Sequence, residues 1–259
     1  MTQFTEIVGK VPTLDEALNT SVAPAALTFR TGITATLDED NLAGSDAKIC
    51  QAARVSTVGS AAAETKEAKG LINFLMRDRH GSPFEHGQLS FLVEAPIFVA
   101  REFMRHRVGW SYNETSGRYR ELEPVVYIPP ASRPLVQVGK AGRYRFEQGS
   151  REQYLTAMEQ HATAYLAAWE AYQKMLSEGI AREVARDVLP VGLFTSFYAT
   201  CNPRSLMHFL SLRTTSAWAT FPSFPQAEIE RVADEMEKAF SVHFPLTWEA
   251  YLDNGRVCP

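Results

Sequence analysis

Three basic side chains and the polar segment that follows them could together bind an anion. Arg105, His106 and Arg107 are succeeded by hydroxyl, amide and glycine residues, and then by Arg118. A guanidinium is a planar fork that matches phosphate oxygens, and hydroxyl or backbone N–H groups can complete the shell. The segment therefore predicts a site for a phosphorylated ligand whose identity stays open. The alternative is a cationic helix end, which the helix dipole favours by itself.

A second short segment, His80–His86 (HGSPFEH), contains two histidines and a glutamate and invites a metal site. Its spacing differs from the HExxH pattern of helical zinc sites, and Pro83 disfavours a continuous helix through it. A polar turn that leads into a strand is the simpler interpretation. We therefore expect no metal ion.

Two further pairs of basic residues are spaced to share a helix face. Arg204 and His208 lie four residues apart, as do Arg182 and Arg186. Arg213, five residues past His208, points in another direction and could serve a different ligand or subunit. Each pair alone is typical of the basic rim of an amphipathic helix. Together, the arginines favour a ligand that carries phosphate.

The positive charge is local, because the chain as a whole is acidic. Its 259 residues carry a formal net charge of −4, with a pI near 5.9. A protein that coats nucleic acid usually has a basic excess, so nucleic acid is not an expected partner. Local arginine clusters in an acidic chain suit a nucleotide or dinucleotide cofactor. The sequence has neither a GxGxxG nor a Walker loop, so another architecture must hold that cofactor.

Cysteine usage predicts a reducing compartment. Cys50, Cys201 and Cys258 are widely spaced and form no CxxC pair, which argues against a disulfide framework. The chain opens with no signal-peptide pattern and contains no apolar run of membrane-spanning length. We expect a soluble cytoplasmic protein with no membrane partner.

Hydrophobic periodicity indicates the elements that must position these residues. Strands are predicted at residues 27–37, 88–94, 125–128 and 136–146. Helices are predicted at residues 45–54, 62–79, 96–107, 151–178, 180–188, from 203 onward, and 229–240. Pro96 can open the helix that ends in Arg105–Arg107, and Asn202 can cap the helix that begins at Pro203. The mixture favours one α+β domain over residues 26–259, after an N-terminal extension over residues 1–25.

The segment Arg105–Tyr119 (RHRVGWSYNETSGRY) resembles the signature of the flavin-dependent thymidylate synthases, which is RHR, seven residues, then Ser. Further stretches resemble the same family in the same order. They are ARVS from Ala53, HGSPFEH, APIFVAREFMRHR, REVARDVLP and NPRSLMHFLSLR. The resemblance therefore covers most of the chain outside the first 25 residues or so and the tail.

This resemblance implies an α+β fold with a central, mainly antiparallel sheet flanked by helices. It also implies a homotetramer whose active sites are shared between subunits. The implied reaction is the reductive methylation of dUMP to dTMP. Methylenetetrahydrofolate would be the one-carbon donor, and FAD reduced by NADPH would carry the hydride.

The resemblance also implies roles for individual residues. FAD would be bound by Ser56, Ser82, Arg105, His106, Arg107, Glu114, Asn202, Pro203, Arg204 and His208. The nucleotide dUMP would be bound by Glu102, Phe103, Met104, Arg105, Glu114, Thr115, Ser116, Gly117, Arg118, Arg186 and Arg213. His80 would lie near the flavin and uracil rings and, with Arg213, would be catalytic.

The implied chemistry needs a nucleophilic carbon at C5 of uracil. The classical thymidylate synthases obtain it by adding a cysteine thiolate to C6, but no cysteine here lies in a matching motif. Cys201 is better explained as a small buried residue. An arginine such as Arg213 at the pyrimidine edge would instead favour ionisation at N3 and push electron density toward C5. The hydride would come from the flavin.

The chain departs from the family pattern in four places. Eight residues instead of seven separate Arg107 from Ser116, with the extra one within 108–110. Glu102 stands where some relatives have Gln, and an acid there would need an arginine partner. His208 replaces an amide. Residues 219–225 form an insertion that could reshape the entrance for folate or NADPH.

Two other classes of function compete with this interpretation. A non-enzymatic nucleotide- or RNA-binding protein would use the Arg- and Tyr-rich surface, but the acidic pI and the absence of an RNP or OB-like pattern disfavour it. A flavoprotein with another reaction on a nucleotide is the second. Arg186 and Arg213 favour the dUMP reaction over it, because a dUMP pocket needs them and a generic flavoprotein does not.

Overall fold

The computed structural model describes residues 27–58, 65–140 and 143–259. The predicted N-terminal extension, residues 1–25, lies outside this part of the chain. Contacts between the described residues group into two compact units. The first unit contains the described parts of residues 27–32, 96–98 and 116–194, and the second contains those of 33–95, 99–115 and 195–259.

A four-stranded sheet in the order β2-β3-β8-β4 forms the centre of the second unit. Its strands are β2 (Thr34–Leu37), β3 (Leu89–Pro96), β8 (Phe194–Cys201) and β4 (Trp110–Glu114). β2 pairs antiparallel with β3, and β4 pairs antiparallel with β8. Alternate residues of β3, among them Phe91, Val93 and Ala95, are fully buried, as expected for a strand that packs against a core. The predicted α+β fold with a mainly antiparallel sheet is confirmed.

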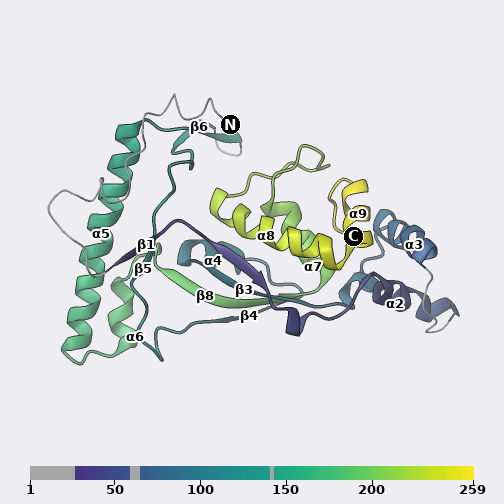
Figure 1. The fold of residues 1–259 in the computed structure, drawn as a ribbon, viewed down its shortest axis with the longest axis horizontal. Helices are drawn as coiled ribbons and strands as arrows, with labels where there is room; N and C mark the ends of the chain where they lie inside the picture. The colour runs from purple at the N-terminus through teal and green to yellow at the C-terminus, as the bar shows by residue number, and fades with distance from the viewer. Residues whose placement is uncertain (1–26, 59–64, 141–142) are drawn as a thin grey trace. The chain divides into compact units, whose positions relative to one another are not determined.

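Helices cover one face of this sheet and one of its ends (Figure 1). Over the face lie α7 (Pro203–Arg213) and α8 (Ala227–His243), and α8 packs on β2 and on α7. Near the end lie α2 (Asp46–Val58), α3 (Thr65–Arg77) and α9 (Pro245–Asp253), with α3 packed on both others. Two short 3-10 turns, η1 (Glu39–Asn41) and η2 (Ser82–Glu85), complete the unit. The sequence predicted α2, α3, α7 and α8 but not α9.

A buried carboxylate explains why α9 begins where it does. Asp46 is 8% exposed and accepts hydrogen bonds from the backbone N–H groups of Leu246 (2.7 Å) and Thr247 (3.0 Å) and from the Thr247 hydroxyl (2.6 Å). These N–H groups belong to the first turn of α9. The N–H groups of a first turn have no acceptor within their own helix. The cap therefore comes from a residue 200 positions earlier in the chain.

The first unit contains two small sheets and one long helix. β1 (Thr28–Arg30) pairs parallel with β5 (Val125–Tyr127), and β6 (Val136–Lys140) pairs antiparallel with β7 (Arg143–Glu147). The helix α5 (Arg151–Ser177) begins with a capping box between Ser150 and Gln153. After it come α6 (Arg182–Ala185) and η3 (Arg186–Val188).

The helix predicted over 151–178 is confirmed as α5, and its Tyr165, Trp169 and Tyr172 are buried in one cluster with Val126 and Leu193. No helix within the described ranges is long and apolar enough to cross a membrane.

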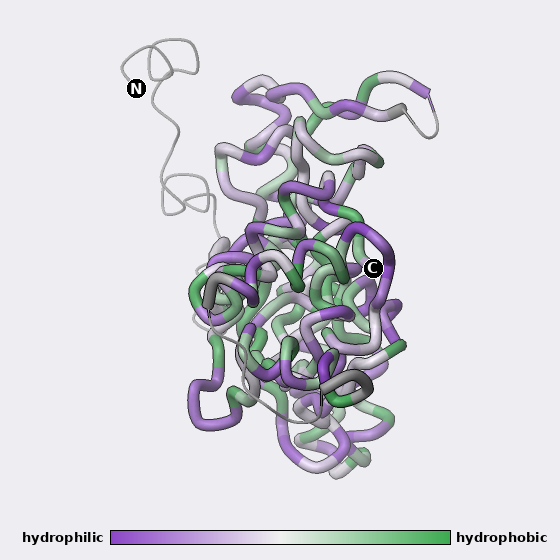
Figure 2. The backbone as a smooth tube through the Cα atoms, turned by 90° about the vertical axis from the view of Figure 1, so that its right-hand side faces the viewer, coloured by the Kyte–Doolittle hydropathy of each residue, from purple (hydrophilic) through white to green (hydrophobic). Residues whose placement is uncertain are grey.

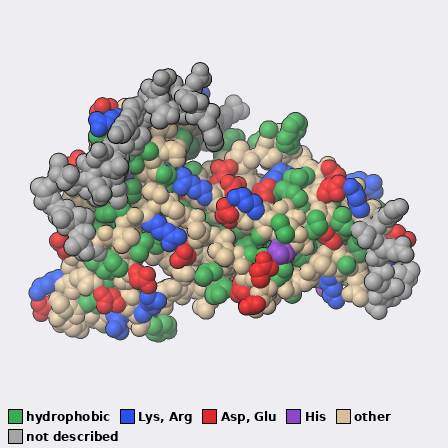
Figure 3. Space-filling model, viewed as in Figure 1, with side chains coloured by type: hydrophobic (Ala, Val, Ile, Leu, Met, Phe, Trp, Pro, Cys, Tyr) green, Lys and Arg blue, Asp and Glu red, His purple; other side chains and the backbone are tan. Residues whose placement is uncertain are grey.

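The distribution of polarity follows the elements. Figure 2 shows hydrophobic stretches passing through the interior and hydrophilic ones in the outer turns. On the face drawn in Figure 3, acidic and basic side chains are interspersed.

Several predicted elements have different bounds in the structure. The helix predicted over 96–107 is α4 (Ile97–Phe103), so Pro96 ends β3 and Arg105–Arg107 lie in the turn beyond α4. The polar segment after Trp110 is not a loop, because residues 110–114 are hydrogen-bonded to β8 as β4. Pairing with β8 begins at Trp110, so the chain must leave the helix early enough to turn.

The strand predicted over 27–37 is interrupted at residues 31–33, and the helix predicted over 180–188 begins only at Arg182.

Candidate active site

Arg213, at the end of α7, is held by two side chains of the second unit. Its Nε donates a hydrogen bond to Nε2 of His106 over 3.0 Å, and its guanidinium forms an ion pair with the carboxylate of Glu102. The side chains of Arg213 and Glu102 are 18% and 29% exposed. The arginine partner that the sequence requires for Glu102 is therefore Arg213. A fixed, partly accessible guanidinium can bind an anionic or polar ring edge.

His106 is buried and uncharged. The side chain is 7% exposed, and its ring centroid lies 4.8 Å from that of Phe209 and 6.0 Å from that of His208. Burial, followed by the charge of Arg213, lowers its pKa to about 4. Because Nε2 accepts from Arg213, the ring proton of the neutral form is assigned to Nδ1. His106 therefore orients Arg213 without adding a second positive charge.

The low pKa of His106 predicts a loss of stability in weak acid. The unfolded chain takes up a proton near pH 6.5, whereas the folded chain takes it up only near pH 4. The stabilising contribution is therefore complete above pH 6.5 and lost as the pH falls toward 4, by about 3 kcal/mol. Urea unfolding at pH 7 and pH 4.5 measures it. His106→Gln should depend less on pH over this interval, and an equal dependence in both proteins would contradict the assignment.

A pocket of about 420 Å³ lies in the same unit. Its lining residues come from the start of α7, the turn before β4, η2 and the last residues of the chain; they are Glu85, Val108, Gly109, Asn202, Arg204, Ser205, His208, Cys258 and Pro259. Arg204 donates to the Glu85 carboxylate over 2.6 Å and to the Pro259 carbonyl over 2.8 Å. The predicted shared face of Arg204 and His208 is confirmed, since both line this pocket.

The chain between Arg107 and β4 makes a glycine turn at the pocket wall. Gly109 has a φ of +68°, and a Cβ there would lie 2.2 Å from the Ser205 Oγ and 2.8 Å from the Asn202 Nδ2. The Ser205 hydroxyl donates to the Val108 carbonyl over 2.8 Å. The turn is therefore packed on the start of α7, and only glycine fits its position 109. The predicted cap is confirmed, because Asn202 Oδ1 accepts from the Ser205 N–H over 2.8 Å.

The other residues expected to bind FAD occupy varied positions. Arg105 and Arg107 are exposed in the turn after α4, and Ser82 is exposed in η2. Glu114, at the end of β4, accepts from the Thr195 hydroxyl over 2.6 Å. Ser56 lies in α2, but its side chain is outside the part of the chain that the structure describes.

His80, expected near the reacting rings, is exposed and stacks on Phe74 with ring centroids 5.5 Å apart. Phe103, expected to contact dUMP, is fully buried against the aromatic rings of Trp110, Phe197 and Phe209. Its ring therefore supports the turn that carries His106. Met104 and Thr115 are half-buried, and the Thr115 N–H donates to the Ser196 carbonyl over 2.9 Å.

Four of the residues expected to bind dUMP belong to the first unit and lie together there. Gly117 is buried, and a Cβ on it would lie 3.3 Å from the Cδ of Arg186. The Ser116 hydroxyl accepts from the Arg118 N–H over 3.3 Å. Arg118 forms an exposed ion pair with Glu183 at 3.1 Å. Two guanidiniums, a hydroxyl and a glycine turn thus share one small region, which suits phosphate.

All three thiols are poor nucleophiles in this structure. Burial raises the pKa of Cys201 well above its usual range and raises that of Cys258 to about 11. Burial also raises the pKa of Cys50. The thiolate is the reactive form, and little of it exists near neutral pH. The interpretation of Cys201 as a small buried residue is confirmed by its 3% exposure.

Pocket residues that sequence reasoning did not select are Glu85, Val108, Gly109, Ser205, Cys258 and Pro259. Glu85 lies within a motif whose histidines drew attention, but its pairing with Arg204 spans 119 residues. The residues of the chain end show no local pattern. Within the described ranges, no group of three or more His, Cys, Asp or Glu residues is arranged to hold a metal ion.

The predicted insertion lies between α7 and α8. Its aromatic side chains Phe221 and Phe224 are 68% and 75% exposed. The segment is tied to the body by the Ser223 hydroxyl, which donates to the Thr214 carbonyl, and by the Thr220 N–H, which donates to the Gly255 carbonyl over 2.9 Å. It therefore has a defined path with its rings outward.

Comparison with known proteins shows the family and agrees with the fold. Residues 38–246 match the Thy1 family, described as thymidylate synthase complementing protein. The chain is 56% identical over 236 residues to a flavin-dependent thymidylate synthase of Streptomyces avermitilis, covering 89% of this chain and 95% of that protein. It is 52% identical over 219 residues to one of Tropheryma whipplei, covering 83% and 91%.

A solved structure of a similar protein has the same fold. The UMP/dUMP methylase PolB of Streptomyces cacaoi, bound with 5-Br UMP, superimposes with a TM-score of 0.84 and 48% identity over 90% of this chain and 100% of that one. A second structure of PolB, bound with 5-Br dUMP, has the same TM-score and identity. The residues that match the family model include Arg105–Arg107 and the pocket-lining start of α7, and the chain belongs to the Thy1 family of flavin-dependent thymidylate synthases.

Proposed function

We propose that the protein converts dUMP to dTMP, with methylenetetrahydrofolate as one-carbon donor and FAD, reduced by NADPH, as hydride carrier. The observation that carries the proposal is the position of Arg213. Neutral His106 and the Glu102 carboxylate hold it, and the His106 ring lies 6.0 Å from His208 at the pocket. A fixed cation beside a cofactor-sized pocket is the arrangement that the reaction needs.

The pocket fits part of a flavin cofactor. Its volume of about 420 Å³ falls within the range of about 300–1,000 Å³ of small-molecule sites. The Arg204 side chain is 42% exposed, so a ligand phosphate can reach it. Asn202, Pro203, Arg204 and His208 would hold the cofactor from α7, Ser56 and Ser82 from α2 and η2, and Arg105, His106, Arg107 and Glu114 from the turn and strand after α4. When bound, FAD supplies the hydride.

Arg213 is assigned the activation of the pyrimidine. A guanidinium stays cationic at working pH, so it favours the form of uracil that is ionised at N3, which places electron density on C5. Glu102 pairs with it, and His106 fixes its direction. No thiol is required, which agrees with the raised pKa values of all three cysteines. His80 is assigned to the ring-binding region.

The first unit is assigned to the nucleotide phosphate. Ser116, Gly117, Arg118 and Arg186 supply the donors, and Glu102, Phe103, Met104, Arg105, Glu114 and Thr115 complete the set proposed for dUMP. We also propose a homotetramer with active sites shared between subunits, residues 26–259 as the catalytic domain, and the segment 219–225 at the entrance for folate or NADPH.

Methylation of UMP is a second candidate, because PolB, which is 48% identical to this chain, is a UMP/dUMP methylase. Both nucleotides are substrates for the same chemistry at C5, and they differ in the 2′-hydroxyl of the sugar. Only a direct comparison of kcat/KM for the two nucleotides assigns the preference.

The decisive assay incubates the purified protein with FAD, NADPH, methylenetetrahydrofolate and either nucleotide, and separates the products chromatographically. We expect flavin absorbance in the protein and dTMP only when both folate and reductant are present. A variant with Ala at positions 50, 201 and 258 should still form product. Product without reductant, or a folded cysteine-free variant with no activity, would point to the classical thiolate mechanism.

A further inference from the structure

The last residues of the chain fold back onto the pocket. After α9, Gly255 and Arg256 have φ values of +67° and +58°. Two successive residues in the left-handed region reverse the direction of the chain. Residues 256–259, here called the closing segment, then run along the start of α7, where Cys258 and Pro259 line the pocket.

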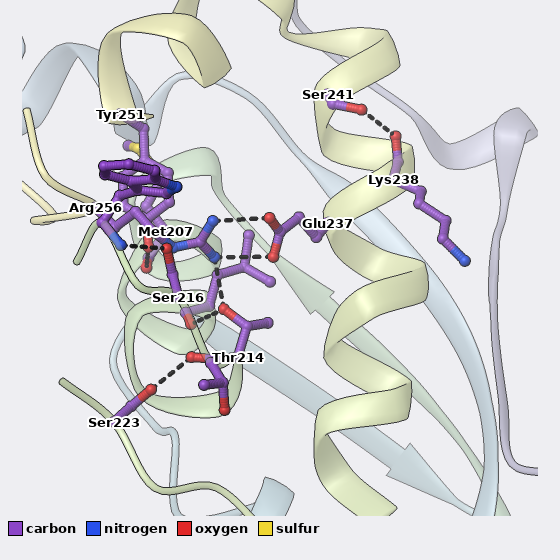
Figure 4. Close-up of polar contacts among 12 residues, drawn as sticks. Met207, Thr214, Ser216, Ser223, Glu237, Lys238, Ser241, Tyr251 and Arg256 are labelled. Atoms are coloured by element: carbon purple, nitrogen blue, oxygen red, sulfur yellow. Dashed lines mark hydrogen bonds and ion pairs between the residues drawn. The ribbon is translucent and has the colours of Figure 1, made fainter. Parts of the chain in front are cut away.

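Arg256 anchors the closing segment in the core. Its side chain is buried, at 6% exposure, and forms hydrogen bonds to both carboxylate oxygens of Glu237 on α8, at 2.8 and 2.9 Å. It also donates to the Thr214 hydroxyl just after α7 and contacts the rings of Trp248 and Tyr251 (Figure 4). The start of the segment is therefore fixed to three elements.

The other end of the segment forms hydrogen bonds with both the backbone and the side chain of Arg204. The Cys258 thiol donates to the Arg204 carbonyl over 3.2 Å, and the Pro259 carbonyl accepts from Arg204 Nε over 2.8 Å. Arg79 donates to the Cys258 carbonyl over 3.0 Å and holds the segment from outside. Pro259 is buried. The segment is a built part of the pocket wall.

The guanidinium of Arg204 consequently has one orientation. Nε is bound to Pro259, and Nη1 is bound to Glu85 at 2.6 Å. Gly81 lies directly against the guanidinium, because a Cβ on Gly81 would be 2.5 Å from the Arg204 Cζ. These contacts place the plane of the guanidinium before a ligand arrives, and preorganisation of this kind reduces the entropy lost on binding.

We propose that the closing segment is a positioning element that orients Arg204 for the phosphate groups of the flavin cofactor. This inference rests on the proposed function. It adds Pro259, Cys258 and Arg79 as residues that act on the cofactor through Arg204 and need not touch it. Arg204 binds the phosphates, and the segment keeps its side chain directed into the pocket.

The test is a double-mutant cycle on FAD affinity, measured by titrating flavin-free protein and following flavin fluorescence. Deletion of Cys258 and Pro259 should raise the FAD Kd about tenfold, the scale of one hydrogen bond to a charged group. Arg204→Ala should raise it at least as much. If the segment acts through Arg204, deletion in the Arg204→Ala background should add nothing.

Two further variants test whether the change in FAD affinity comes from the backbone contacts of the closing segment. Pro259→Ala keeps the backbone carbonyl that accepts from Arg204 and should bind FAD with a Kd within about twofold of the parent protein. Arg79→Asn removes the outer contact at a residue with φ of +64°, which Asn tolerates. It should raise the Kd several-fold, and it carries the test if the deletion variant does not fold.

The outcomes separate the two proposals. If the parent protein binds no FAD, the proposed function fails. If it binds FAD but deletion and Arg79→Asn leave the Kd unchanged, the closing segment has no positioning role. Additive effects of deletion and Arg204→Ala would show that the segment contributes independently of Arg204, which also overturns the inference.

Discussion

Replacing Arg213 with Met is expected to lower kcat/KM for dTMP formation by about 100- to 1,000-fold, the scale of losing one preorganised charge-stabilising donor. The side chain is fixed by His106 and Glu102, so no neighbouring group can take over its position. FAD affinity should change little, because Arg213 does not line the pocket. Steady-state kinetics with dUMP, combined with a flavin titration, separates the two effects.

Three control variants make this result interpretable. Arg213→Lys keeps the charge but loses the planar fork, so it should recover only part of the activity. Glu102→Gln keeps an acceptor for Arg213 and should cost less than Arg213→Met. Arg77→Met removes an exposed arginine that pairs with Asp78 and should leave kcat/KM unchanged. Near-normal activity of folded Arg213→Met would remove Arg213 from the mechanism.

Replacing Arg256 with Met is expected to lower the free energy of unfolding by about 3–5 kcal/mol, because it leaves the carboxylate of Glu237 without its partner in the interior. The side chains of Arg256 and Glu237 are 6% and 20% exposed. For a chain of this size the midpoint of thermal unfolding should fall by about 10 °C. Differential scanning fluorimetry and urea unfolding measure the change.

The pairing of the two charges can be tested directly. Arg256→Met combined with Glu237→Leu replaces the ion pair by an apolar pair and should recover most of the loss. Arg145→Met removes an exposed ion pair with Glu147 and should cost no more than about 0.5 kcal/mol. If Arg256→Met is no more costly than this exposed control, the buried pair does not stabilise the fold.

Elements with local signals could be predicted from the sequence. The cap at Asn202 lies next to the helix that it begins, so α7 was predicted with its start. The hydrophobic period that begins after Arg151 predicted α5. The first turn of α9 depends on Asp46, 200 residues away, and no local pattern reveals it. β4 and β8 were also not predicted. Both contain polar residues, and each strand is stabilised by its pairing with the other.

The same limit applies to the site. The spacing of Arg204 and His208 was enough to predict that the two side chains share a helix face. The chemistry of Glu102 required an arginine, but its identity as Arg213 depends on a contact across 111 residues. The pairing of Arg204 with Glu85 and Pro259 depends on the folded path of the chain. Sequence patterns thus indicated the participants, and tertiary contacts determine their partners.

Because His106 is neutral, its contribution to the charge of the active site does not change with pH near neutrality. Its pKa of about 4 lies well below the range in which an unperturbed imidazole titrates. The charge of the His106 ring is therefore constant between about pH 5 and 8. A bend in the pH–rate profile within that interval must come from another group of the enzyme or from its ligands. The central histidine of the Arg105–Arg107 segment therefore accepts the hydrogen bond of Arg213 as a neutral ring throughout this interval.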